Sequence, residues 1–133
     1  SGLTCQIVAT DISEKALTRA RSGRYSQLEV QRGLSAPRLI KNFTKDADDF
    51  WTIKPHLKAA VSFRNQNLLL PFDSLGKFDI IFCRNVLIYQ SVPNKRAIIA
   101  RLHAQLVDGG FLVLGAGESM LGLSSDFTNV SVN

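Results

Sequence analysis

The feature that most constrains the fold is a strand–helix–strand pattern in the second half of the chain. Lys77–Cys83 is a continuous apolar run typical of a buried strand. A helix is predicted to begin near Ser91, with a proline in its first turn, and to end at Asp108–Gly110. Its apolar stripe consists of Ile99, Leu102 and Leu106. Because Phe111–Leu114 again has the composition of a strand, the pattern favours a parallel sheet.

The first half of the chain repeats this alternation with an interruption. Gln6–Ile12 is β-branched and apolar, and Ser13 offers a helix cap after it. That helix is predicted to end at Ser22-Gly23. Residues 24–58 are mixed, and we expect an insertion there with one or two short helices and a short strand pair. Ala60–Arg64 is the next predicted strand, and the fold class is therefore α/β with a largely parallel sheet.

Size and composition are those of one globular domain. The chain has 133 residues, of which 45% are hydrophobic and 20% are charged. It contains no apolar run of the roughly 18 residues that a membrane helix needs, and it does not begin with a secretion segment. We therefore expect a cytoplasmic protein with no membrane insertion.

The net charge and the cysteines exclude few classes of function. A net charge of +5 permits an acidic partner, but the basic residues are scattered without interleaved aromatic side chains, so nucleic acid is not expected. Cys5 and Cys83 lie within or beside strand-like runs, and we interpret them as small buried hydrophobic residues. His56 and His103 are isolated, and the chain therefore predicts no metal site.

Polar residues follow each of the four predicted strands. They are Thr10-Asp11, Asn65-Gln66-Asn67, Arg84-Asn85 and Gly115–Ser119. Ligands of parallel α/β sheets bind outside the carboxyl ends of the strands, so these residues are the candidates for a binding site.

Each candidate has an ordinary structural interpretation beside the functional one. Asp11 is placed to accept hydrogen bonds from the two hydroxyls of a ribose, but it could equally cap the following helix. Asn67 could bind an adenine edge with Leu68 against the ring, or simply form a turn. Arg84-Asn85 interrupts an apolar run, which suits the mouth of a cleft. The glycines of Gly115–Glu118 lack the spacing of a phosphate-binding loop and are interpreted as turn residues.

Four motifs in this order resemble the CheR-type chemotaxis receptor methyltransferases, and the resemblance covers nearly the whole chain. The matching stretches are ATDI at 9–12, ARSGRY at 20–25, the segment closing with NLL at 61–69, and FDIIFCRNVLIY at 78–89. The last of these is the most specific. The resemblance implies a Rossmann-like class I methyltransferase sheet, truncated, with a small inserted α/β subdomain at about residues 26–60.

The resemblance also implies an activity and a set of site residues. The enzyme would be a bacterial protein-glutamate O-methyltransferase of chemotaxis signal transduction, using S-adenosyl-L-methionine and releasing S-adenosyl-L-homocysteine. Its substrate would be the cytoplasmic domain of a chemoreceptor. By position, Asp11 would bind the cofactor ribose, Asn67-Leu68 the adenine, and Arg84-Asn85 would line the pocket. Tyr89 would be the catalytic residue, near the sulfonium and the incoming carboxylate.

Two departures from the family pattern lead to further expectations. The family's glycine-containing cofactor loop would precede Leu3 and its last strands would follow Asn133, so we expect a fragment, with its activity in isolation left open. The strand missing from the middle of the sheet would leave unpaired edges, which predicts a homodimer or swapped assembly. Lys45–Lys58 contains no glycine, whereas family members that bind a receptor's C-terminal pentapeptide have a glycine-rich loop there. We therefore expect no pentapeptide binding.

Three other classes of function stay open at this level. A nicotinamide-dependent oxidoreductase shares the acidic residue at a strand end, but not the CRNVLIY stretch. A catalytically inactive methyltransferase-like module that only binds proteins has the same sequence features. A basic nucleic-acid binder is the third class, and salt-independent behaviour toward duplex DNA would exclude it.

Overall fold

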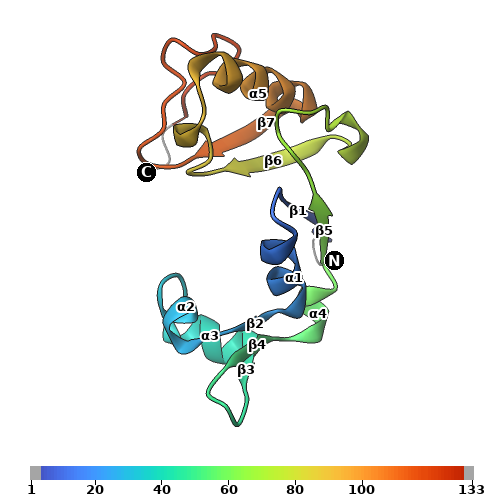
Figure 1. Ribbon diagram of the computed structural model, residues 1–133, viewed down its shortest axis with the longest axis vertical. Helices are drawn as coiled ribbons and strands as arrows, with labels where there is room; N and C mark the ends of the chain where they lie inside the picture. Colours follow the sequence, from blue (N-terminus) through green and yellow to red (C-terminus); the bar gives the residue numbers. More distant parts are fainter. Residues whose placement is uncertain (1–3, 131–133) are drawn as a thin grey trace. The chain divides into compact units, whose positions relative to one another are not determined.

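A computed structural model describes residues 4–130 of the chain (Figure 1). The chain divides into two compact units, one ending at Asn67 and the other beginning at Leu68. The elements of the first unit are β1 (Ile7–Asp11), α1 (Glu14–Ser22), β2 (Arg24–Tyr25), α2 (Gln27–Gln31), α3 (Ala36–Asn42), β3 (Phe43–Lys45), β4 (Trp51–Ile53), α4 (Pro55–Lys58) and β5 (Val61–Asn65). Those of the second are η1 (Asp73–Leu75), β6 (Phe78–Cys83), η2 (Leu87–Tyr89), α5 (Val92–Gln105) and β7 (Leu106–Leu114).

In the first unit, β1 and β5 pair in parallel, with Ile7 opposite Val61 and Asp11 opposite Asn65. Helix α1 follows β1 directly, and its N-cap is Ser13, whose hydroxyl accepts a hydrogen bond from the Ala16 amide at 3.2 Å. It ends at Gly23, which adopts the left-handed conformation with φ of 66° that favours glycine. The strand and the helix predicted from residues 6–23 are therefore confirmed.

The insertion forms an antiparallel sheet in the order β2-β4-β3. A strand pair was expected, and the structure adds a third strand because Arg24 and Tyr25 pair with Thr52 and Trp51. The acidic run after β3 forms the turn of the β3–β4 hairpin. Asp46 stabilises this turn, since its carboxylate accepts the Phe50 amide at 3.0 Å and pairs with Arg24 at 2.8 Å.

In the second unit, β6 and β7 pair in parallel and α5 connects them across one face (Figure 1). The start of α5 is as predicted, with Ser91 as N-cap. Its end was predicted three residues too late: α5 stops at Gln105, and Leu106 already belongs to β7. The reason is strand pairing, since Leu106 lies opposite Phe78 in the parallel ladder and is buried there in an extended conformation.

The hydrophobic core of the second unit lies between α5 and the sheet. Its buried members are Phe72, Cys83, Leu87, Ile98, Ile99 and Leu102. The expectation that the strand at residues 77–83 is buried throughout is wrong. Ile80 and Phe82 are 51% and 72% exposed, because side chains alternate along a strand and α5 covers only one face of the pair.

Three expectations from the sequence concern the sheet, the two ends of the chain and membrane-spanning helices. Within residues 4–130, β1-β5 and β6-β7 form separate two-stranded parallel sheets. The segments expected to be missing would precede Leu3 and follow Asn133, and both of these residues lie outside the described residues. No helix in the described part of the chain is long and apolar enough to cross a membrane.

Candidate functional site

The carboxyl end of β1 places Asp11 at the surface of the first unit. Its Oδ1 accepts a hydrogen bond from the Ser13 amide at 2.8 Å, whereas the cap of α1 is Ser13 itself. Its Oδ2 receives no hydrogen bond from any other described residue. On the neighbouring strand, Asn65 donates to the Ile12 carbonyl at 3.1 Å, and the Gln66 amide donates to the Asp11 carbonyl at 3.0 Å. The two strand ends are therefore tied together, and one carboxylate oxygen of Asp11 stays available.

Asn67 and Leu68 lie at the boundary between the two units. Both are half-buried. The Gln66 side chain donates to the Asn67 carbonyl at 2.8 Å, and the Leu68 carbonyl accepts from Arg101 on α5 at 3.4 Å. Leu68 also packs against the core of the second unit. The dipeptide thus lies just after β5, and Leu68 begins a turn.

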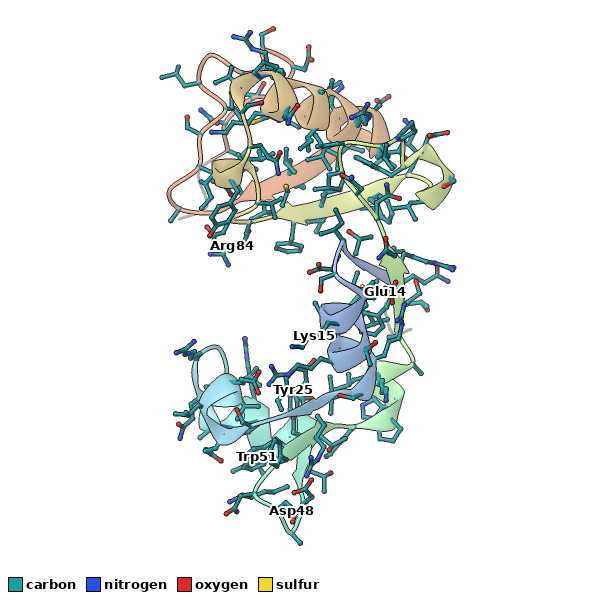
Figure 2. The ribbon with its side chains drawn as sticks, in the orientation of Figure 1. Glu14, Lys15, Tyr25, Asp48, Trp51 and Arg84 are labelled. Carbon is teal, nitrogen blue, oxygen red and sulfur yellow. The ribbon has the colours of Figure 1, made fainter. Side chains whose placement is uncertain are left out.

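The loop after β6 presents the other three candidates within the second unit. Arg84, Asn85 and Tyr89 are all exposed, and Tyr89 is 81% exposed. Figure 2 shows Arg84 beside the strand end, on the side of the sheet away from α5. Leu87, between them, is only 2% exposed and belongs to the core. Leu87 therefore anchors the loop in the core, while Arg84 and Tyr89 at its two ends are exposed.

Asn85 has an unusual backbone conformation. Its φ is 59°, in the left-handed region that most residues other than glycine avoid and that asparagine tolerates best. The turn η2 follows it, and the Gln90 amide closes that turn on the Leu87 carbonyl at 2.9 Å. The run that interrupts the apolar sequence therefore contains a residue in a locally strained backbone conformation.

Glu118 holds this loop; it was included in the Gly115–Ser119 cluster in the sequence analysis, but was assigned no role there. Its Oε2 accepts the amides of Asn85 at 2.7 Å and Gly115 at 2.8 Å. Its Oε1 accepts the amides of Leu87 at 2.8 Å and Ile88 at 3.3 Å. The available signal was a carboxylate in a glycine-rich stretch after a strand, where backbone amides lack ladder partners.

The electrostatics of this carboxylate follow from its contacts. Desolvation raises the pKa of Glu118, but the four backbone N–H donors outweigh it, and the pKa lies below its ordinary value of 4.5. Burial, and then the nearby Glu118 charge, raise the pKa of the Cys83 thiol to about 11. Glu118 is therefore ionised at neutral pH and Cys83 is a neutral thiol.

Gly115 has a role beyond the turn that was predicted for it. A Cβ at this position would lie 2.2 Å from Asn85 Oδ1 and 2.9 Å from Glu118 Oε2. Gly117, two residues later, has no atom within 4 Å of the corresponding position. Gly115 is thus required for the close approach of Asn85 and Glu118.

The cysteines and potential metal ligands add no second centre. Cys83 is buried, as expected, whereas Cys5 is exposed because it precedes β1 and packs into no core. Both are free thiols. Across residues 4–130, no group of three or more histidine, cysteine or acidic side chains could hold a metal ion.

The chain matches one protein family over residues 1–133, the family described as CheR methyltransferase, SAM binding domain. The chain belongs to the CheR methyltransferase family. This assignment confirms the Rossmann-like methyltransferase fold class and the cofactor class, S-adenosylmethionine. It decides against the nicotinamide-dependent oxidoreductase.

Curated relatives of this CheR domain carry chemotaxis names. The chain is 47% identical over 125 residues to chemotaxis protein methyltransferase Cher2 of Pseudomonas putida. The alignment covers 94% of this chain and 46% of that protein. It is 46% identical over 127 residues to chemotaxis protein methyltransferase 1 of Vibrio cholerae, covering 96% of the chain and 46% of the relative. The Klebsiella aerogenes chemotaxis protein methyltransferase is 34% identical over 127 residues. The chain spans about half the length of the curated relatives it matches.

The CheR domain contains groups of the kind that S-adenosylmethionine needs. The cofactor carries a ribose diol, and the available Oδ2 of Asp11 is an acceptor at a parallel strand end. The exposed side chains of the Arg84–Tyr89 loop are available to a bound molecule. The donor set of these residues therefore fits the cofactor class.

Proposed function

We propose that this chain is the cofactor-binding part of a protein-glutamate O-methyltransferase that acts on the cytoplasmic domain of a bacterial chemoreceptor. The observation that carries the proposal is the family match over all 133 residues. Relatives named chemotaxis protein methyltransferase support the chemotaxis context. A methyltransferase domain with one inserted subdomain, at about residues 26–60, is the domain organisation that goes with it.

We assign the site residues as the sequence motifs place them. Asp11 accepts hydrogen bonds from the ribose hydroxyls, and Asn67-Leu68 holds the adenine by its edge and its face. Arg84-Asn85 lines the pocket at the end of β6. Tyr89 lies beside the reacting groups, which is compatible with its exposed position on η2.

The reaction requires the protein mainly to position the two reactants. S-adenosylmethionine supplies a methyl group activated by its sulfonium. A glutamate side chain is already ionised at pH 7, so no residue of the chain has to remove a proton from it. Alignment of the two reactants contributes through effective molarity, and the chain's binding residues provide this alignment. The lack of a catalytic triad or carboxylate pair in the sequence is consistent with such a reaction.

The test is calorimetric titration of the chain with S-adenosylhomocysteine, the reaction product. We expect saturable binding that Asp11→Ala abolishes. Asp11→Asn is the sharper variant, because it retains an oxygen for the Ser13 amide while it replaces the second acceptor with a donor. We expect it to remain folded and to lose at least about tenfold in affinity, equivalent to one charge-assisted hydrogen bond.

The matched control is Glu14→Gln, which removes one acidic charge at the start of α1 and should leave affinity unchanged. Glu14 is exposed, and within residues 4–130 its carboxylate pairs with Arg21 alone, at 3.3 Å. Equal affinity of wild type and Asp11→Asn would contradict the ribose assignment. If the folded wild-type chain does not bind, the same titration on the full-length protein separates a half-site that lies outside this chain from an inactive protein-binding module.

The partners that belong to this proposal are limited to the chemoreceptor, in the cytoplasm. We expect neither nucleic acid binding nor membrane insertion. We also expect no tethering to a receptor C-terminal pentapeptide, because Lys45–Lys58 has no glycine and its turn is closed internally by Asp46. Saturable anisotropy of a labelled pentapeptide would contradict this.

We further propose that the isolated chain forms a homodimer. The β6-β7 sheet exposes apolar side chains at Ile80, Phe82 and Phe111, which supports association through this part of the sheet. Light scattering at micromolar concentration measures the mass directly. A monomeric mass would refute the dimer without affecting the enzymatic proposal.

A further inference from the structure

Two loops follow neighbouring strands at the same end of the β6-β7 sheet. The strands end opposite each other, with Cys83 paired to Leu114. The loop after β6 carries Arg84, Asn85 and Tyr89, and the loop after β7 carries Glu118. The Glu118 carboxylate joins the two loops through backbone amides of both.

The conformation of the loop after β6 requires a hydrogen-bond acceptor such as the Glu118 carboxylate. Asn85 lies in the left-handed region, and the short 3₁₀ turn of η2 has little stability of its own. The amides of Asn85, Leu87 and Ile88 all donate to Glu118 and to no strand. Without an acceptor, the partly buried amide of Leu87 would be left unsatisfied.

The contacts of Glu118 also exclude a direct role in proton transfer or in contacting a bound molecule. Each of its two oxygens already accepts two backbone hydrogen bonds, which fills the acceptor capacity of a carboxylate. It is therefore unavailable as a base or as a ligand for a bound molecule. Apart from the electrostatic effect of its charge, it can act on a bound molecule only through the shape of the loop.

We propose that Glu118 is a positioning residue that fixes the Arg84–Tyr89 loop in the conformation required for cofactor binding. The proposal rests on the proposed function in one respect only, that Arg84, Asn85 and Tyr89 contact the cofactor. Its structural part, the control of the loop by Glu118, stands on the hydrogen bonds alone. The prediction is that loss of this carboxylate weakens cofactor affinity at a distance.

The test uses Glu118→Gln, with Asp126→Asn as control. The amide nitrogen of glutamine cannot accept a hydrogen bond, so two of the four backbone amides lose their partner. Asp126→Asn makes the same charge change in the same unit, at an exposed residue that is hydrogen-bonded to Ser124. If Glu118→Gln does not fold, Glu118→Asp retains the charge on a side chain one methylene shorter and takes its place.

The first measurement is hydrogen exchange of the individual amides by NMR. We expect the amides of Asn85, Leu87 and Ile88 to exchange at least about tenfold faster in Glu118→Gln, while those of Ile98 and Ile99 in α5 are unchanged. In Asp126→Asn, all five should exchange as in wild type. Unchanged loop exchange in the Glu118 variant would overturn the proposal.

The second measurement is the dissociation constant for S-adenosylhomocysteine of the same proteins. We expect an increase of at least about tenfold for Glu118→Gln and none for Asp126→Asn. Faster loop exchange with unchanged affinity would show a purely structural role and would also overturn the proposal. If the wild-type chain does not bind, the titrations are repeated with the full-length protein. Absence of binding there refutes the proposed function, while the exchange rates still test the control of the loop by Glu118.

Discussion

Replacing Gly115 with alanine tests the packing between the two loops most directly. The added Cβ would lie 2.2 Å from Asn85 Oδ1, whereas ordinary contacts of a Cβ lie between 3.4 and 4 Å. The Asn85 amide must therefore move by more than about 1 Å, which its exposed side chain can do by rotation at little cost. The Cβ would also lie 2.9 Å from Glu118 Oε2, which displaces the carboxylate from the amides it accepts.

The expected loss of stability combines two effects of similar size. Overpacking against the Glu118 carboxylate, which four backbone amides hold in place, costs about 1–3 kcal/mol. Weakening of one or two hydrogen bonds to the Glu118 carboxylate adds about 1 kcal/mol after allowance for its partial exposure. We therefore expect Gly115→Ala to lower the free energy of unfolding by about 2–4 kcal/mol.

The assay is urea unfolding followed by far-UV circular dichroism, with Gly117→Ala as the matched control. Gly117 lies in the same loop, has open space at its Cβ position and does not have a positive φ. Its substitution should change the free energy of unfolding by less than about 1 kcal/mol, because alanine there only restricts the unfolded chain. If the two variants differ by less than about 0.5 kcal/mol, the close approach at Gly115 does not constrain the loop and our reasoning fails.

Three further predictions concern thiol reactivity, pH and the core. Maleimide at pH 8 should label exposed Cys5 in the native protein and Cys83 only after unfolding, because Cys83 is buried and its thiol pKa is about 11; a doubly labelled native mass would contradict this. The folded pKa of Glu118 lies below 4.5, so its contribution to loop stability is complete above that pH and is lost as the pH falls through the folded value. Amide shifts of the loop followed between pH 6 and 2 should accordingly change below 4.5, and a change centred above 5 would oppose the assignment. Ile98→Ala should cost about 2–5 kcal/mol by urea unfolding because Ile98 is 1% exposed, whereas Ile40→Ala, at a 70% exposed residue, should cost under about 0.5 kcal/mol.

Local sequence signals were sufficient for the elements whose causes are local. Ser13 and Gly23 bound α1 because a cap hydroxyl and a left-handed glycine act within one turn of the chain. Ser91 marks the start of α5 for the same reason. The specific stretch at residues 78–89 pointed to the family, which the match over the whole chain then established.

The tertiary structure decided whatever depends on partners distant in sequence. Leu106 is a strand residue because Phe78 pairs with it, although the helical apolar period continues through that position. Phe82 is exposed because only one face of β6 meets α5, which no periodicity within the strand could indicate. Glu118 receives amides from residues about 30 positions earlier, a spacing that no local motif encodes. The sequence by itself thus determined the family and the separate elements, and three-dimensional pairing determined which strand faces are covered and which carboxylate holds the loop proposed to bind the cofactor.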